Sequence, residues 1–213
     1  ADQTWTTYNR DNSGLARGPV QAIAEDSNGT MWFGTRYGGV SAFDGVAWTT
    51  FVAESGSLED VQSIASDSHG TVWVASNGSG VSSFDGHVWT SYTRSANGLA
   101  HNRISAILQD SRGVLWFGTT LGLSSLEGED WTTYDTRNST LVDKVVQVVA
   151  EDHAGSLWLG TTLGVSAFDG EIWTSYDTGN SGLAGNAVLS IVVDSAGTLW
   201  FGTNGTGVSA FDG

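Results

Sequence analysis

A unit of about 42 residues recurs along this 213-residue chain. Its most regular feature is a tryptophan followed by Thr-Thr or Thr-Ser, and successive copies lie 43, 41, 42 and 42 residues apart. These residues are Trp5, Trp48, Trp89, Trp131 and Trp173. Self-similarity at a fixed period of roughly 20–50 residues is typical of arrays of equal structural units. The content of one unit therefore decides the architecture.

Each unit contains four short segments with the composition of β-strands. In the unit that starts at Val20 they read VQAIAED, TMWFGT, GVSAFD and VAWTTF, with the turns SNG, RYG and DG between them. Asp-Gly between short strands favours a tight hairpin, because glycine accepts the positive φ of the turn. No stretch of ten residues shows a helical period. Four strands per unit is the content of a propeller blade, so the sequence predicts an all-β propeller with four antiparallel strands per blade.

The two ends of the chain are complementary parts of one unit. Residues 3–8 read QTWTTY and match the fourth strand of a blade, whereas the last residues, SAFDG, match the end of a third strand. Joined end to end they reproduce the internal SAFDGVAWTT with two extra residues in the turn. We therefore predict a single domain over residues 1–213, a closed five-bladed β-propeller in which the N-terminal strand completes the last blade and leaves no open edge.

Two further sets of residues recur in every unit. The second tryptophan set is Trp32, Trp73, Trp116, Trp158 and Trp200, and its fivefold repetition inside strands favours packing between blades over ligand stacking. An aspartate opens each Asp-x-x-Gly turn, at Asp26, Asp67, Asp110, Asp152 and Asp194. Calcium binding is one interpretation, but a single turn offers too few carboxylates, so turn capping is favoured. No metal site is expected.

Composition excludes several partners. The net charge is −15 with only 8 lysines and arginines, which argues against nucleic acids and anionic lipid surfaces. Without cysteine there is no disulfide or thiolate chemistry. No apolar run approaches the roughly 18 residues of a membrane span, and the first residues do not resemble a signal peptide. We expect no membrane insertion and a monomer.

The charges divide between the two faces of the predicted propeller. With strands named A to D from the axis outward, the D-to-A and B-to-C connections form the top face and the other turns form the bottom face. Seven of the eight cations fall on the top: Arg10, Arg17, Arg36, Arg94, Arg103, Arg137 and Lys144. Seven acids balance them: Asp11, Glu54, Glu59, Asp60, Asp135, Asp143 and Asp177. The excess negative charge is therefore expected on the bottom face.

The top connections also vary most between units, as expected of a site carried on a regular scaffold. They bring amides, hydroxyls, one tyrosine and a few charges to one end of the axis, a set that suits a polar small molecule or a glycan. The candidate ligand-binding residues are Arg17, Arg36, Tyr37, Asn77, Ser79, His101, Asn102, Arg103, Thr120, Lys144, Thr162, Asn186, Asn204 and Thr206. The alternative is that each is an ordinary solvated loop residue.

Residues 98–128, GLAHNRISAILQDSRGVLWFGTTLGLSSLEG, resemble the two-component regulator propeller repeat, and the resemblance extends over every unit. Two departures are a loop shortened by two residues within residues 52–61, and Ala75 and Ser76 in place of Gly-Thr. Members of that family are mostly seven-bladed periplasmic sensor regions of histidine kinases that often detect glycan fragments. The resemblance implies a sensor or ligand-binding role and a periplasmic or extracellular location.

An enzyme is the least favoured interpretation. His101 is the only top-face histidine, and related propeller lyases place a catalytic histidine near the axis, so His101 with Asp60 or Asp143 is the one pair that fits a general base and its orienter. No serine-hydrolase, zinc or phosphate-loop motif occurs. We therefore expect a non-enzymatic binding module without a cofactor; the alternative is a structural or protein-interaction scaffold, natural or engineered.

Overall fold

The computed structural model describes residues 4–52 and 58–213, and these form five antiparallel sheets. Blade 1 contains β1 (Val20–Glu25), β2 (Met31–Thr35), β3 (Val40–Phe43) and β4 (Trp48–Phe51). Blade 2 contains β5 (Val61–Ser66), β6 (Val72–Ser76), β7 (Gly80–Phe84) and β8 (Trp89–Tyr92). Blade 3 contains β9 (Ile104–Gln109), β10 (Leu115–Thr119), β11 (Gly122–Glu127) and β12 (Asp130–Tyr134). Blade 4 contains β13 (Val146–Glu151), β14 (Leu157–Thr161), β15 (Val165–Phe168) and β16 (Trp173–Tyr176). Blade 5 contains β17 (Val188–Val193), β18 (Leu199–Thr203) and β19 (Gly207–Phe211).

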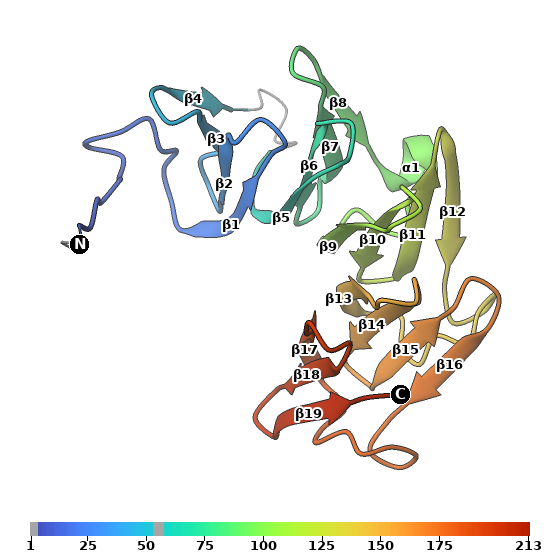
Figure 1. Ribbon diagram of the computed structural model, residues 1–213. Coiled ribbons are helices and arrows are strands. Elements are labelled where there is room, and N and C mark those ends of the chain that lie inside the picture. Colours follow the sequence, from blue (N-terminus) through green and yellow to red (C-terminus); the bar gives the residue numbers. More distant parts are fainter. Residues whose placement is uncertain (1–3, 53–57) are drawn as a thin grey trace.

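Each sheet is a simple meander, with strands paired in chain order. Figure 1 shows the blades following one another along an arc, with the first strand of each on the inner side. These inner strands pack in sequence, β1 on β5, β5 on β9, β9 on β13 and β13 on β17. One helical turn, α1 (Arg94–Asn97), lies between blades 2 and 3 and was not predicted. The five-bladed, all-β propeller architecture is confirmed.

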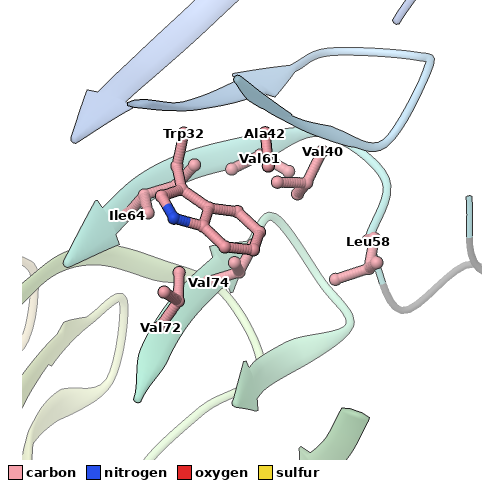
Figure 2. Packing of buried hydrophobic residues seen from close by; sticks show 8 residues of the cluster. All are labelled: Trp32, Val40, Ala42, Leu58, Val61, Ile64, Val72 and Val74. Atoms are coloured by element: carbon pink, nitrogen blue, oxygen red, sulfur yellow. The ribbon is translucent and has the colours of Figure 1, made fainter. Parts of the chain in front are cut away.

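The hydrophobic core lies between blades. Figure 2 shows Trp32 and Val40 of blade 1 packed with Val61, Ile64 and Val74 of blade 2. The other three clusters likewise each join one blade to the next. Inter-blade packing of the second tryptophan set is confirmed for four members, which are buried: Trp32, Trp73, Trp116 and Trp158.

The close approach of adjacent blades explains the glycine in the repeated Phe-Gly-Thr or Leu-Gly-Thr sequence. A Cβ added to Gly34 would lie 2.3 Å from Cγ1 of Val61 in the next blade, and a Cβ on Gly160 would lie 2.8 Å from Cγ1 of Val188. Such distances force atoms apart, so glycine is required by packing at these positions. Ala75, the exception in blade 2, is fully buried at the interface with blade 3.

The predicted closure of the ring is not found. Among the described residues, β19 pairs only with β18, and residues 4–9 form no strand. Tyr8 instead packs on blade 1, with ring centroids 5.6 Å from Phe43 and 5.4 Å from Trp48. Figure 1 shows the arc open between this N-terminal segment and β19. Inter-blade packing sets the angle between neighbouring sheets, and here five sheets do not complete a circle.

Candidate functional site

The bottom-face aspartates are turn caps. In blade 2, Asp67 Oδ1 accepts hydrogen bonds of 2.9 Å from the backbone N–H groups of His69 and Thr71, and Oδ2 accepts one of 2.8 Å from the Trp73 indole. The same arrangement occurs in every blade. Within the described ranges, no three or more His, Asp or Glu side chains gather where a metal ion could be held. The predicted capping role is confirmed, and these carboxylates are occupied within their own turns.

Asp60 organises the top-face residues of blades 1 and 2. Its carboxylate accepts a 2.7 Å hydrogen bond from Asn77 Nδ2 and a 3.0 Å bond from Gln62 Nε2, and Arg36 Nε lies 3.8 Å away. The guanidinium carbon of Arg36 also lies 5.3 Å from the ring centre of Tyr37. Three predicted site residues are thus brought together, but Asp60 neutralises the arginine. Gln62 was not among the predicted site residues, because no binding motif marks it.

Asn102 and the residues around it connect blades 2 and 3. The Asn102 carbonyl accepts hydrogen bonds of 3.0 and 2.9 Å from the N–H groups of Gly78 and Gly80, which flank Ser79. Its side-chain Oδ1 accepts a 2.7 Å bond from the Arg94 N–H. An isolated β-bridge pairs Asn77 with Arg103. Asn102 therefore holds two loops in place, and its amide oxygen is already engaged.

His101 is fixed by its own loop and does not form the predicted catalytic pair. Nδ1 lies 2.9 Å from Thr120 Oγ1 and accepts a 3.1 Å hydrogen bond from the Arg103 N–H. Burial lowers the pKa of His101, and the positive charges of Arg94 and Arg103 lower it further. The ring is therefore neutral at pH 7, with its proton on Nε2.

The two acids considered as partners of His101 have other contacts. Asp60 is engaged as described above, and buried Asp143 accepts a hydrogen bond from the Thr162 hydroxyl. No hydrogen bond or ion pair joins either acid to His101 in the described part of the chain. The structure therefore does not bring His101 together with either aspartate, because Asp60 contacts Arg36, Gln62 and Asn77 and Asp143 contacts Thr162.

A cavity of about 510 Å³, here called the Lys144 cavity, lies on the top face between the loops of blades 3 and 4. Its walls include Arg94, Lys144, Arg137 and Asp135, and the half-buried Leu121 supplies apolar surface. Of these residues only Lys144 was in the predicted set. Arg137 Nη2 lies 2.5 Å from Asp135 Oδ2. Arg94 and Lys144 form no ion pair with any described residue. The cavity is therefore positively charged in a strongly acidic chain.

A second cavity of about 380 Å³ opens near blade 1, and Arg10, Arg17 and Tyr37 are among its lining residues. Arg17 Nε donates a 3.4 Å hydrogen bond to the Tyr37 carbonyl. Two of the predicted top-face residues, Arg17 and Tyr37, therefore lie beside each other. This cavity is separate from the Lys144 cavity, since the two have no lining residue in common.

The candidate residues of blade 5 do not join either cavity. Asn186 Oδ1 accepts a 2.8 Å hydrogen bond from the Thr178 N–H, and the Asn204 N–H donates a 2.8 Å bond to the Ala187 carbonyl. Thr206 Oγ1 lies 2.7 Å from Thr203 Oγ1. Because the arc is open, blade 5 lies at the opposite end from blade 1 (Figure 1). The fourteen candidates therefore line no single axial mouth.

These observations define the class: a β-propeller whose loops of variable sequence share one face. Three stretches, residues 14–37, 98–120 and 182–205, match the model of the two component regulator propeller family. The resemblance read from the sequence is thus confirmed for these three stretches, which together cover about a third of the chain. No curated protein sequence matches the chain significantly.

Solved structures support the same fold. The extracellular domain of a hybrid two component system from B. thetaiotaomicron superposes with a TM-score of 0.82 at 21% identity, over 97% of this chain and 30% of that one. PorZ, a surface component of the type-IX secretion system of Porphyromonas gingivalis, gives 0.76 at 19% identity, over 97% of this chain and 34% of its own. Virginiamycin B lyase from Staphylococcus aureus gives 0.69 at 15%, over 92% and 70%.

This chain therefore spans about a third of the length of the first two relatives. At these identities the likeness concerns the fold. In the residues that the structure describes, no helix combines the length and the apolar character needed to cross a bilayer.

Proposed function

We propose that the chain is a non-enzymatic, sensor-type binding module that takes a polar small molecule or glycan bearing a negatively charged group. The observation that carries this proposal is that Arg94 and Lys144, in the walls of the Lys144 cavity, form no ion pair with any described residue. The net charge of −15 repels anions from the molecule as a whole, so an anionic group is favoured only where cations gather, as they do in this cavity. Apolar surface from the half-buried Leu121 can contact the rest of a sugar ring.

The comparisons support the sensor part of the proposal. Family repeats of regulator propellers are present, and two of the similar structures are described as an extracellular domain and a bacterial surface component. We propose the same extracellular or periplasmic setting here. A binding role without catalysis is also favoured by the His101 geometry, because its possible aspartate partners are engaged elsewhere.

The test compares two oligosaccharides of equal length, one neutral and one containing uronic acids, by thermal shift and calorimetry at millimolar concentration. We expect the acidic oligosaccharide to bind and the neutral one to bind at least 10-fold more weakly. A hydrogen bond to a charged group contributes about 1.5–3 kcal/mol, so Arg94→Gln or Lys144→Gln should each weaken binding about 10- to 100-fold.

The matched control is Arg10→Gln, which removes an exposed arginine from the other cavity. Arg10→Gln removes one positive charge, as Lys144→Gln does. It therefore distinguishes the loss of a direct contact with the ligand from a general decrease in the protein's attraction for anions. The proposal is contradicted if neither oligosaccharide binds, if both bind equally, or if Arg10→Gln weakens binding as much as Lys144→Gln.

A further inference from the structure

The first blade exposes residues that the later blades bury wholly or in part. Ile23 of β1 is 60% exposed, whereas its repeat equivalents in β5, β13 and β17, Ile64, Val149 and Ile191, are at most 9% exposed, and Ile107, the equivalent in β9, is half-buried. Val20 differs from its equivalents in the same way. The later residues are covered by the preceding blade, as Trp32 and Val40 of blade 1 cover Ile64. Val20 and Ile23 therefore form the head face of the array, which has the chemistry of an inter-blade surface but no blade upon it.

The last blade exposes the opposite half of the same interface. Trp200 is 43% exposed and Val208 is 63% exposed, while their equivalents in blade 4, Trp158 and Val165, are 6% and 1% exposed. Trp158 and Val165 are covered by Val188 and Ile191 of blade 5. Trp200 and Val208, here called the tail face, therefore match the head face residue for residue.

Residues 4–8 already lie where the fourth strand of a preceding blade would be. Tyr8 packs on Phe43 and Trp48 of blade 1, as Tyr134 of β12 packs on Phe168 and Trp173 of blade 4. The loop after each segment is also held alike: Asn12 Nδ2 donates 2.9 Å to the Thr7 carbonyl, and Asn138 Nδ2 donates 2.8 Å to the Thr133 carbonyl. The segment thus occupies the position of a fourth strand without pairing as one, and its Trp5 is 94% exposed.

Blade 5 offers the matching place. In blade 4, Trp173 packs 4.5 Å from Phe168 and 5.6 Å from Tyr134, and β16 pairs Trp173 with Phe168 and Tyr176 with Val165. The equivalents of Phe168 and Tyr134 at the last blade are Phe211 and Tyr176, and both line an apolar pocket beside β19. No described tryptophan of the first set fills it. By the repeat, Trp5 would pair with Phe211 and Tyr8 with Val208.

We propose that this 213-residue chain associates head to tail: residues 4–8 of one copy become the fourth strand of blade 5 of another, and Val20 and Ile23 cover Trp200 and Val208. A second copy is the occupant because the chain's own residues 4–8 are held on blade 1, at the other end of the arc. The interface pairs two different surfaces, so association produces either a closed ring or an open filament. This inference replaces the monomer expected from the sequence and does not depend on the proposed function.

The test uses two variants that each remove one face. Ile23→Asp places a charge on the head face and Val208→Asp places one on the tail face, at side chains that are 60% and 63% exposed. By light scattering after gel filtration, wild type should be larger than one 22.4 kDa chain, and each variant alone should be a monomer. Mixed in equal amounts, the variants should form a heterodimer, because each retains the face that the other lacks.

Two results would overturn the proposal. A wild-type monomer would show that the tail face stays open or is closed by the chain's own N-terminus. A mixture that remains monomeric, with both variants melting cooperatively near the wild-type temperature, would show that head and tail do not bind each other. Trp5→Ala provides a second probe: it removes a side chain that is almost fully exposed within its own copy, and it should weaken association at least 10-fold without lowering the melting temperature of the monomeric Ile23→Asp form.

Discussion

Trp73 donates its indole N–H to Asp67 Oδ2 at 2.8 Å, so a buried tryptophan between two blades is tied to the turn that precedes its own strand. The same six-residue step joins Asp to Trp in all five blades, with distances from 2.7 to 3.0 Å. The aspartate therefore has two structural tasks: one oxygen caps the turn and the other fixes the ring that packs between the blades.

Asp67→Asn should destabilise the protein by about 1–3 kcal/mol, the cost of a buried donor left without its acceptor. Asparagine can keep the cap through Oδ1, but its amide nitrogen cannot accept from the indole. The matched control is Asp194→Asn, whose partner Trp200 is much more exposed and can bond to water. Denaturant unfolding of both variants in the Ile23→Asp background, which keeps blade 5 uncovered, should show the smaller loss for Asp194→Asn. Equal losses would contradict the double role.

The Asp26 carboxylate also makes stability depend on pH below about 4. Burial alone would raise the pKa of Asp26, but hydrogen bonds from the Trp32 indole and from the Thr30 and Asn28 N–H groups outweigh it and hold the pKa below its ordinary value. A carboxylate with a lowered folded-state pKa stabilises the fold above its unfolded pKa of about 3.9, and this contribution is lost as the pH falls through the folded value.

We therefore expect the free energy of unfolding to decrease as the pH falls below about 4, and to decrease less steeply in Asp26→Asn. Urea unfolding at a series of pH values measures both slopes. Parallel slopes for the variant and wild type would show that Asp26 is not among the groups responsible.

His101 should make stability depend on pH at higher pH values than Asp26 does. Its pKa is lowered in the folded state by burial and by nearby arginines, so the unfolded chain binds more protons as the pH falls below about 6.5. Stability is then lost between neutral pH and the folded-state value. His101→Gln should lose less stability between pH 7 and pH 5 than wild type does, with His87→Gln, on an exposed bottom turn, as the control. The expectation fails if both variants retain the wild-type slope.

Gly34→Ala should destabilise the contact between blades 1 and 2 by about 1–3 kcal/mol, the usual effect of overpacking. The added methyl group would meet Val61 at 2.3 Å. Gly182→Ala is the control, because nothing lies within 4 Å of a Cβ there and its φ is not positive. Thermal unfolding of the two variants in the Ile23→Asp background should differ by several degrees. Equal melting temperatures would mean that the interface between blades 1 and 2 accommodates the added methyl group without strain.

The strands, their order and the turn caps could be predicted from the sequence because each depends on residues close together in the chain. Alternating strand residues, Asp-Gly hairpins and the Asp-x-x-Gly turns repeat five times, and repetition makes a local signal unambiguous. The bond between Asp67 and Trp73 was within reach of the same reasoning, since the six-residue step is constant. The burial of Trp32 between blades followed from its recurrence inside strands.

The arrangement of the blades was decided only by the tertiary structure. The seam between SAFDG and QTWTTY is identical in pattern to an internal hairpin, yet Tyr8 packs on Phe43 at the far end of an open arc. The meeting of Arg94 with Lys144 in one cavity likewise joins loops of different sequence. Local patterns specify which residues pair within a sheet. The angle between neighbouring sheets results from many side-chain contacts across each interface, so it cannot be predicted from the sequence of a single repeat.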